Sequence, residues 1–117
     1  MIPSDDHLIR WQQLLELTEK RWQEPPLLNK LLLLIGEKEC GMPPRNNYTE
    51  REQEDLIQMA VSTVLVPARY YELFWVEDTG WPHYRQLQRL PPMSDEEREN
   101  FLKPWIIAYC VKNRMVS

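Results

Sequence analysis

The stretch "VEDTGWPHY", residues 76–84, decides the fold, because it has the pattern of a tight β-turn in a chain that is otherwise helical in pattern. Asp78-Thr79-Gly80 suits a three-residue hairpin loop, with Gly80 in the left-handed position of a G1 bulge. In that register Pro82 falls in a non-hydrogen-bonded pair, where its missing N–H costs no ladder bond. The predicted pairs are Glu77–Trp81, Val76–Pro82, Trp75–His83, Phe74–Tyr84 and Leu73–Arg85. The rival prediction is a helix through "PARYYELF", since Pro67 also suits a first helical position.

Strict alternation would give this hairpin two aromatic faces. One face would hold Tyr71, Leu73, Trp75, Trp81, His83, Arg85 and Leu87, and the other Glu72, Phe74, Val76, Pro82, Tyr84 and Gln86. A helical layer can cover only one face of a two-stranded ribbon, and Pro82 blunts the second strand, so strand 71–77 has the freer edge. The sequence therefore predicts an interaction surface made of Tyr71, Leu73, Trp75, Trp81, His83 and Arg85. The alternative is that the last helix and the N-terminal segment cover both faces within one monomer.

The first half of the chain has two helical patterns. Ser4 suits an N-cap, and one amphipathic face follows: Leu8, Trp11, Leu15, Thr18 and Trp22. Pro25-Pro26 breaks the chain before a leucine-rich stretch over 27–41, which is apolar on more than one face and predicts a central helix. Gly36 inside this stretch permits a close approach of another helix, and Gly41 suits its C-terminal end.

Two capping boxes open the remaining helices. Thr49 with Glu52 precedes a helix that should end near Val66, because Pro67 disfavours helix in the residue before it. Ser94 with Glu97 precedes the last helix, in which Pro104 predicts a kink or a break near Lys103. The predicted fold is one α+β domain over residues 1–117, mainly helical, with four helices and one antiparallel hairpin between the third and fourth.

Composition and charge limit the classes of partner and the cellular compartment that we expect for this protein. The chain has 117 residues and a formal net charge of -4, which argues against a nucleic-acid backbone or an anionic membrane as partner. The longest apolar run, Leu31 to Ile35, is far shorter than a membrane span. Cys40 and Cys110 have no metal-ligand spacing and fit two free, buried thiols in a reducing cytoplasm. We therefore expect a cytoplasmic protein, with a disulfide between these cysteines as the minor alternative.

Motifs that carry chemistry are absent from the sequence. It holds no metal-binding or phosphate-binding motif, and we expect no catalytic residue, metal or cofactor. His83 could act as a base only beside an orienting carboxylate, for which Glu77 is the candidate on the same face. The leading hypothesis is a non-catalytic protein-interaction module or homodimer that uses the hairpin. The alternative is a small-molecule binder or enzyme with a pocket near Trp75, Trp81, His83, Tyr84 and Arg85.

Overall fold

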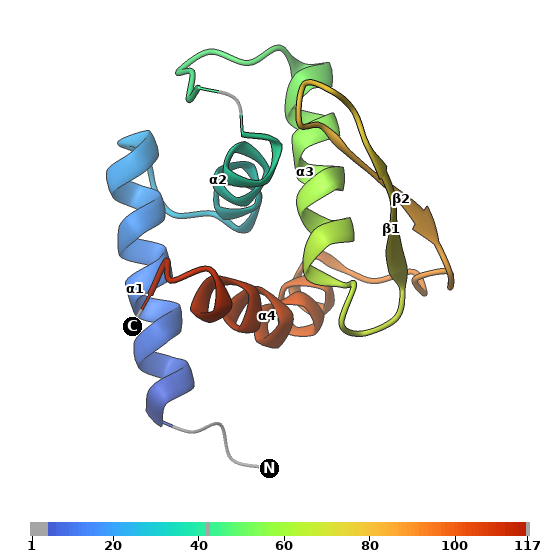
Figure 1. Ribbon diagram of the computed structural model, residues 1–117. Coiled ribbons are helices and arrows are strands. Elements are labelled where there is room, and N and C mark those ends of the chain that lie inside the picture. The colour runs from blue at the N-terminus through green and yellow to red at the C-terminus, as the bar shows by residue number, and fades with distance from the viewer. Residues whose placement is uncertain (1–4, 42, 117) are drawn as a thin grey trace.

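Within residues 5–41 and 43–116, which the computed structural model describes, the chain forms four helices and one hairpin. Figure 1 shows them in chain order: α1 (Asp5–Trp22), α2 (Leu28–Cys40), α3 (Glu50–Val64), β1 (Tyr71–Val76), β2 (Pro82–Gln86) and α4 (Asp95–Lys112). The predicted fold class is confirmed, and the rival helix over 67–74 does not form. The N-cap predicted at Ser4 lies outside the described residues.

The buried face of α1 differs from the predicted one at its start. Trp11, Leu14 and Thr18 are buried, whereas Leu8, predicted on this face, is 57% exposed. The N-terminal end of α1 extends past α4 in Figure 1. Further along α1, the Lys103 ammonium of α4 lies 4.8 Å from the ring centre of Trp11.

Helix α2 is central, as predicted, and contacts both α1 and α3. Its buried residues are Leu31, Leu32, Leu33, Ile35, Gly36, Glu37 and Cys40. The contact with α3 is very close at Gly36, because a Cβ atom built there would lie 2.6 Å from the backbone oxygen of Leu56. This confirms that Gly36 permits a close helix approach. Gly41 ends the helix in the left-handed conformation, with φ of 68°.

Both predicted capping boxes are formed. The Glu52 and Glu97 amides donate to the hydroxyls of Thr49 (3.1 Å) and Ser94 (3.2 Å), and each carboxylate accepts from the amide of its N-cap residue. Of the kink or break predicted near Lys103, the break does not occur, since α4 continues through Pro104. Pro104 removes the hydrogen bond to the carbonyl of Asn100, and both residues are exposed, so water can satisfy that carbonyl.

The hairpin has the predicted turn, but its register differs from the predicted one in the half that lies away from the turn. Glu77 donates its amide to the Trp81 carbonyl (2.9 Å), and Gly80 has φ of 96°. The pairs Val76–Pro82 and Trp75–His83 are confirmed, whereas the pairs predicted for Phe74 and Leu73 are wrong. A β-bulge leaves Phe74 without a partner on β2 and pairs Leu73 with Tyr84. An extra residue in one strand reverses the alternation of side chains beyond it.

The Glu52 carboxylate should make stability sensitive to acid. Its hydrogen bond from the Arg45 guanidinium, and after that its bond from the Thr49 amide, lower its pKa to about 2. The unfolded-state pKa is about 4.3, so the contribution of Glu52 is present above that pH. It is lost as the pH falls toward the folded-state pKa of about 2.

We therefore expect Glu52→Gln to lose less stability than the unchanged protein between about pH 5 and about pH 2.5, measured by urea unfolding at both values. Glu54→Gln is the matched control, because Glu54 is an exposed carboxylate on the same helix. It should follow the unchanged protein. Equal losses in all three proteins would contradict this assignment.

Candidate functional site

One side of the hairpin packs on helix α3. Tyr71 and Pro82 are buried, and the Tyr71 hydroxyl accepts a hydrogen bond of 3.4 Å from the Gln58 side chain of α3. The hydroxyls of Tyr84 and Thr63 lie 2.7 Å apart and hydrogen-bond to each other. Trp81, beside the turn, packs on the small apolar cluster of Leu33, Cys40, Leu56 and Met59. The bulge is what turns Tyr71 toward α3 together with Tyr84, so that both rings gain burial.

The outer side of the hairpin carries two sets of three side chains that contact one another. The rings of Trp75 and His83 are stacked, with centroids 4.7 Å apart and planes 6° from parallel, and the Glu77 carboxylate lies 2.8 Å from His83 Nε2. The Arg85 guanidinium lies 5.3 Å from the ring centre of Phe74 and 2.7 Å from the Glu72 carboxylate. Each charged group thus has an opposite or aromatic neighbour, which holds these side chains in place.

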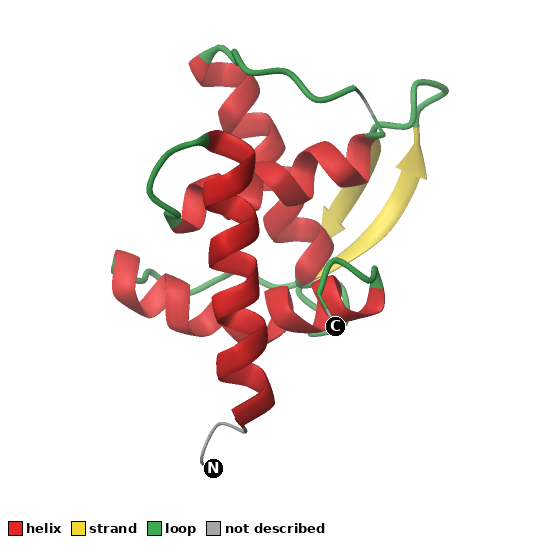
Figure 2. Ribbon diagram, turned by 90° about the vertical axis from the view of Figure 1, so that its left-hand side faces the viewer, coloured by secondary structure: helices red, strands yellow, loops and turns green. Residues whose placement is uncertain are grey.

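Four consecutive large apolar side chains on β1 remain exposed. The exposed fractions are 54% for Leu73, 61% for Phe74, 49% for Trp75 and 50% for Val76. The sheet has only β1 and β2 among the described residues, so the second edge of β1 has no strand partner there. Figure 2 shows the hairpin at one side of the helices. We call this region the hairpin surface, and it consists of Glu72, Leu73, Phe74, Trp75, Val76, Glu77, His83 and Arg85.

No protein-family model, curated protein or solved structure matches this chain.

The structure brings together part of the predicted interaction set. Trp75, His83 and Arg85 share the outer side with Glu72 and Phe74, which alternation had assigned to the opposite face. Tyr71 and Trp81 pack against the helical body instead, and Leu73 is exposed on the strand. The sequence signal for this exposure was the unbroken apolar run from Leu73 to Val76. Strict alternation would place only every second residue of that run on the solvent side of the strand, so it cannot leave all four exposed.

The surface carries little that points to catalysis. His83 does have the orienting carboxylate predicted for it, since Glu77 lies 2.8 Å away. Its described contacts are that carboxylate and the stacked ring of Trp75. Both cysteines are free and buried. Among residues 5–41 and 43–116 no three metal-ligating side chains cluster, and none of the described helices is long and apolar enough to cross a membrane.

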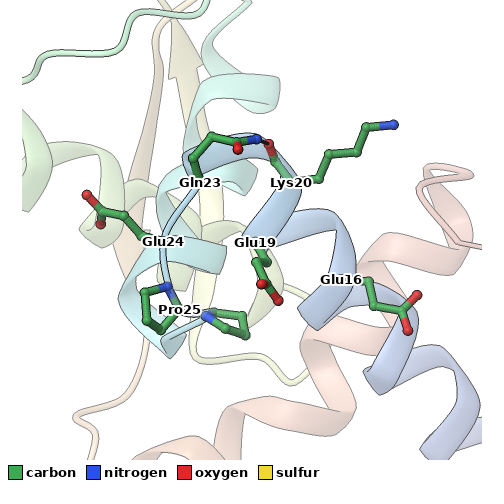
Figure 3. Close-up of a pocket in the computed structure, with 7 residues that line it drawn as sticks. Glu16, Glu19, Lys20, Gln23, Glu24 and Pro25 are labelled. Carbon is green, nitrogen blue, oxygen red and sulfur yellow. Dashed lines mark hydrogen bonds between the residues drawn. The ribbon is translucent and has the colours of Figure 1, made fainter.

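A hollow at the C-terminal end of α1 has a large volume, but the acidic side chains that line it point in different directions. It measures about 620 Å³ and is lined by Glu16, Glu19, Lys20, Gln23, Glu24, Pro25 and Pro26. Figure 3 shows the carboxylates of Glu16, Glu19 and Glu24 pointing in different directions, and all three are exposed. Since a ligand site needs polar groups that converge on one point, we assign no ligand to this hollow.

An ion pair between the half-buried Arg21 and the buried Glu37 lies between α1, α2 and the loop before α3. Arg21 donates to both oxygens of Glu37, at 3.1 and 2.6 Å, and the Tyr48 hydroxyl donates to the same carboxylate at 2.6 Å. Arg21 also donates to the Arg45 carbonyl at 2.8 Å and lies 3.9 Å from the ring centre of Trp22. These partners occupy the cation and the carboxylate, so the cluster ties three segments together.

Proposed function

We propose that this protein is a non-catalytic protein-interaction module that docks through the hairpin surface, and that a second copy of the chain is the first partner to test. The observation that carries the proposal is the exposure of Leu73, Phe74, Trp75 and Val76 in one run on a strand with an open edge. Contiguous exposed apolar side chains of this size usually mark an interaction site. Trp, Phe and Arg are also the side chains enriched at the centres of interfaces.

The order of the outer side chains supports docking. The Trp75–His83 stack and the Glu72–Arg85 pair already hold their members in one arrangement. A partner would then lose little additional side-chain freedom on binding, and this lowers the entropy cost of association. The bulge at Phe74 twists the strand edge and disfavours regular strand addition. We therefore assign docking to the side chains more than to the backbone edge.

The charges of the hairpin surface suit self-association. The whole chain has a formal net charge of -4, yet this surface combines two carboxylates with Arg85 and His83. In a two-fold dimer Arg85 of each copy can meet a carboxylate of the other copy. The surface is much smaller than the roughly 20–30 residues per side of a standard interface. We therefore expect a reversible dimer whose population rises with concentration.

The expected result is that Phe74→Ser with Trp75→Ser weakens self-association at least about tenfold, through loss of the central apolar contacts. Light scattering over a range of concentrations measures the mass, and circular dichroism checks that the helices persist. Leu8→Ser is the matched control, since Leu8 is an exposed leucine on α1 and should leave the mass unchanged. A strictly monomeric unchanged protein, or a double variant that associates equally well, would contradict the dimer.

We also propose a reducing compartment such as the cytoplasm as the place of action. The support is that Cys40 and Cys110 are free and fully buried, with no disulfide among the described residues. Free buried cysteines behave as small apolar side chains. Reduction should therefore leave the thermal unfolding curve unchanged, and a change in that curve on reduction would contradict the proposal.

A further inference from the structure

A second hollow lies where the hairpin, α3 and α4 meet. Its volume is about 410 Å³, within the range of small-molecule sites. Its lining comes from α2, α3, the turn after α3, both strands and the C-terminal part of α4, and it includes Glu39, Thr63, Tyr84, Trp105, Tyr109 and Lys112. This hollow differs from the acidic one of Figure 3, because most of its wall is apolar.

Four polar groups of this hollow are fixed by contacts between separate elements. The Tyr109 hydroxyl of α4 donates to Glu39 Oε2 of α2 at 2.5 Å. The hydroxyls of Tyr84 and Thr63 hydrogen-bond to each other at 2.7 Å, and they join β2 to α3. Each bond involves one part-buried side chain on each side, so the groups are held in position before any ligand arrives.

The charge within this hollow is negative on its inner side. Glu39 is part-buried, and only its Oε2 atom takes part in a described hydrogen bond. Lys112 also lines the hollow, but it is exposed and lies at the last residue of α4. Burial, together with the Glu39 charge, raises the pKa of both Tyr84 and Tyr109. Both phenols therefore stay neutral near pH 7, and Glu39 is the acidic side chain that a ligand would meet.

The walls suit an apolar ligand body. Trp105 of α4 faces the same hollow as Leu73 of β1 and Val66 and Pro67 of the turn after α3. A Trp or Tyr ring can also stabilise a cation that lies over it. An apolar wall, an aromatic ring and one carboxylate together are the groups that recognise an organic ammonium ion.

We propose that this hollow binds a small primary amine with an apolar or aromatic body, its ammonium group paired with Glu39 and its body against Trp105. The tyrosine hydroxyls offer further oxygen acceptors to the ammonium protons. This inference goes beyond the docking function and does not rest on it, because Leu73 is the one residue that the hollow shares with the hairpin surface.

The test uses 2-phenylethylamine, which is charged at pH 7, in isothermal titration calorimetry with the full chain. We expect saturable binding, with a dissociation constant below about 5 mM for a ligand of this size. Two probes of similar shape are the controls: neutral 2-phenylethanol and anionic 3-phenylpropionate. Both should bind at least about tenfold more weakly, because charge-assisted hydrogen bonds contribute more than neutral ones.

Variants of the two charged lining residues locate the ammonium group. Glu39→Gln keeps an oxygen that can accept from Tyr109 but removes the charge, so the affinity for 2-phenylethylamine should fall about tenfold or more. Lys112→Gln should leave the affinity unchanged or raise it. Circular dichroism and thermal unfolding of both variants report whether the fold is kept. If Glu39→Gln changed the fold, Tyr109→Phe would be the second variant to measure. It loses the hydrogen bond to Glu39 and retains the Glu39 carboxylate.

Three results would overturn the proposal. These are the absence of saturable amine binding, equal affinity for the alcohol or the carboxylate, and unchanged affinity in folded Glu39→Gln. Loss of amine binding in Lys112→Gln would likewise place the ligand elsewhere in the hollow. The docking proposal is tested separately, since Phe74→Ser with Trp75→Ser changes no residue that lines this hollow.

Discussion

Arg21→Met should lower the free energy of unfolding by about 3–5 kcal/mol, the cost of leaving a buried charge without its partner. The Glu37 carboxylate is only 7% exposed, and Arg21 donates two hydrogen bonds to it. Tyr48 donates one further bond to Glu37, which places the expected cost at the lower end of that range. Methionine keeps the apolar stem of the side chain, so the loss reports on the charge and its hydrogen bonds.

Urea unfolding measures this loss of stability. A double variant and a variant at another ion pair show whether the loss comes from the unpaired charge. Replacing both charges in Arg21→Met with Glu37→Leu should recover much of the stability, because no isolated charge then remains buried. Lys30→Met is the comparison at a more exposed ion pair, since Lys30 pairs with the exposed Glu24, and it should cost no more than about 1 kcal/mol. If Arg21→Met costs no more than Lys30→Met, the ion pair does not hold α1 to α2 in the way we infer.

Gly36→Ala should destabilise the protein by about 2 kcal/mol, although alanine is the better helix former by about 1 kcal/mol. The added methyl group would lie 2.6 Å from the backbone oxygen of Leu56 and 3.2 Å from its Cβ atom. A backbone oxygen cannot rotate away as a side chain can. Helices α2 and α3 must therefore move apart, and contacts of both apolar clusters are lost.

Thermal and urea unfolding of Gly36→Ala and Gly36→Val decide this point. The loss should grow from alanine to valine, because the clash grows with the volume of the side chain. Gly41→Ala is the comparison at the end of the same helix, where no atom lies within 4 Å and only the positive φ causes strain. A gain in stability for Gly36→Ala would show that helix propensity outweighs packing and that the two helices separate easily.

Much of the fold follows from local chemistry. The two capping boxes, the breaks at Pro25-Pro26 and Pro67 and the turn at Gly80 each depend on residues close together in the chain. Such signals act before distant segments meet, and sequence alone is enough to read them. Gly36 is similar, since an interior helical glycine already indicated a close contact, though not that Leu56 would make it.

The candidate sites depend on tertiary packing to a greater degree. The register set by the turn correctly paired Trp75 with His83, but it could not show the bulge at Phe74, which lets Tyr71 and Tyr84 both face α3. The amine site also had no sequence signal, because Glu39 and Tyr109 are 70 residues apart in the chain and 2.5 Å apart in space.

The sequence by itself therefore determined the elements, their ends and the presence of surplus aromatic residues on the hairpin. Only the tertiary structure decided which of those residues are covered. The physical reason is that capping and turn energies come from neighbouring residues, whereas burial depends on which side of a strand meets a helix. One extra residue in β1 was enough to change that side, and it left Phe74 and Trp75 together in water.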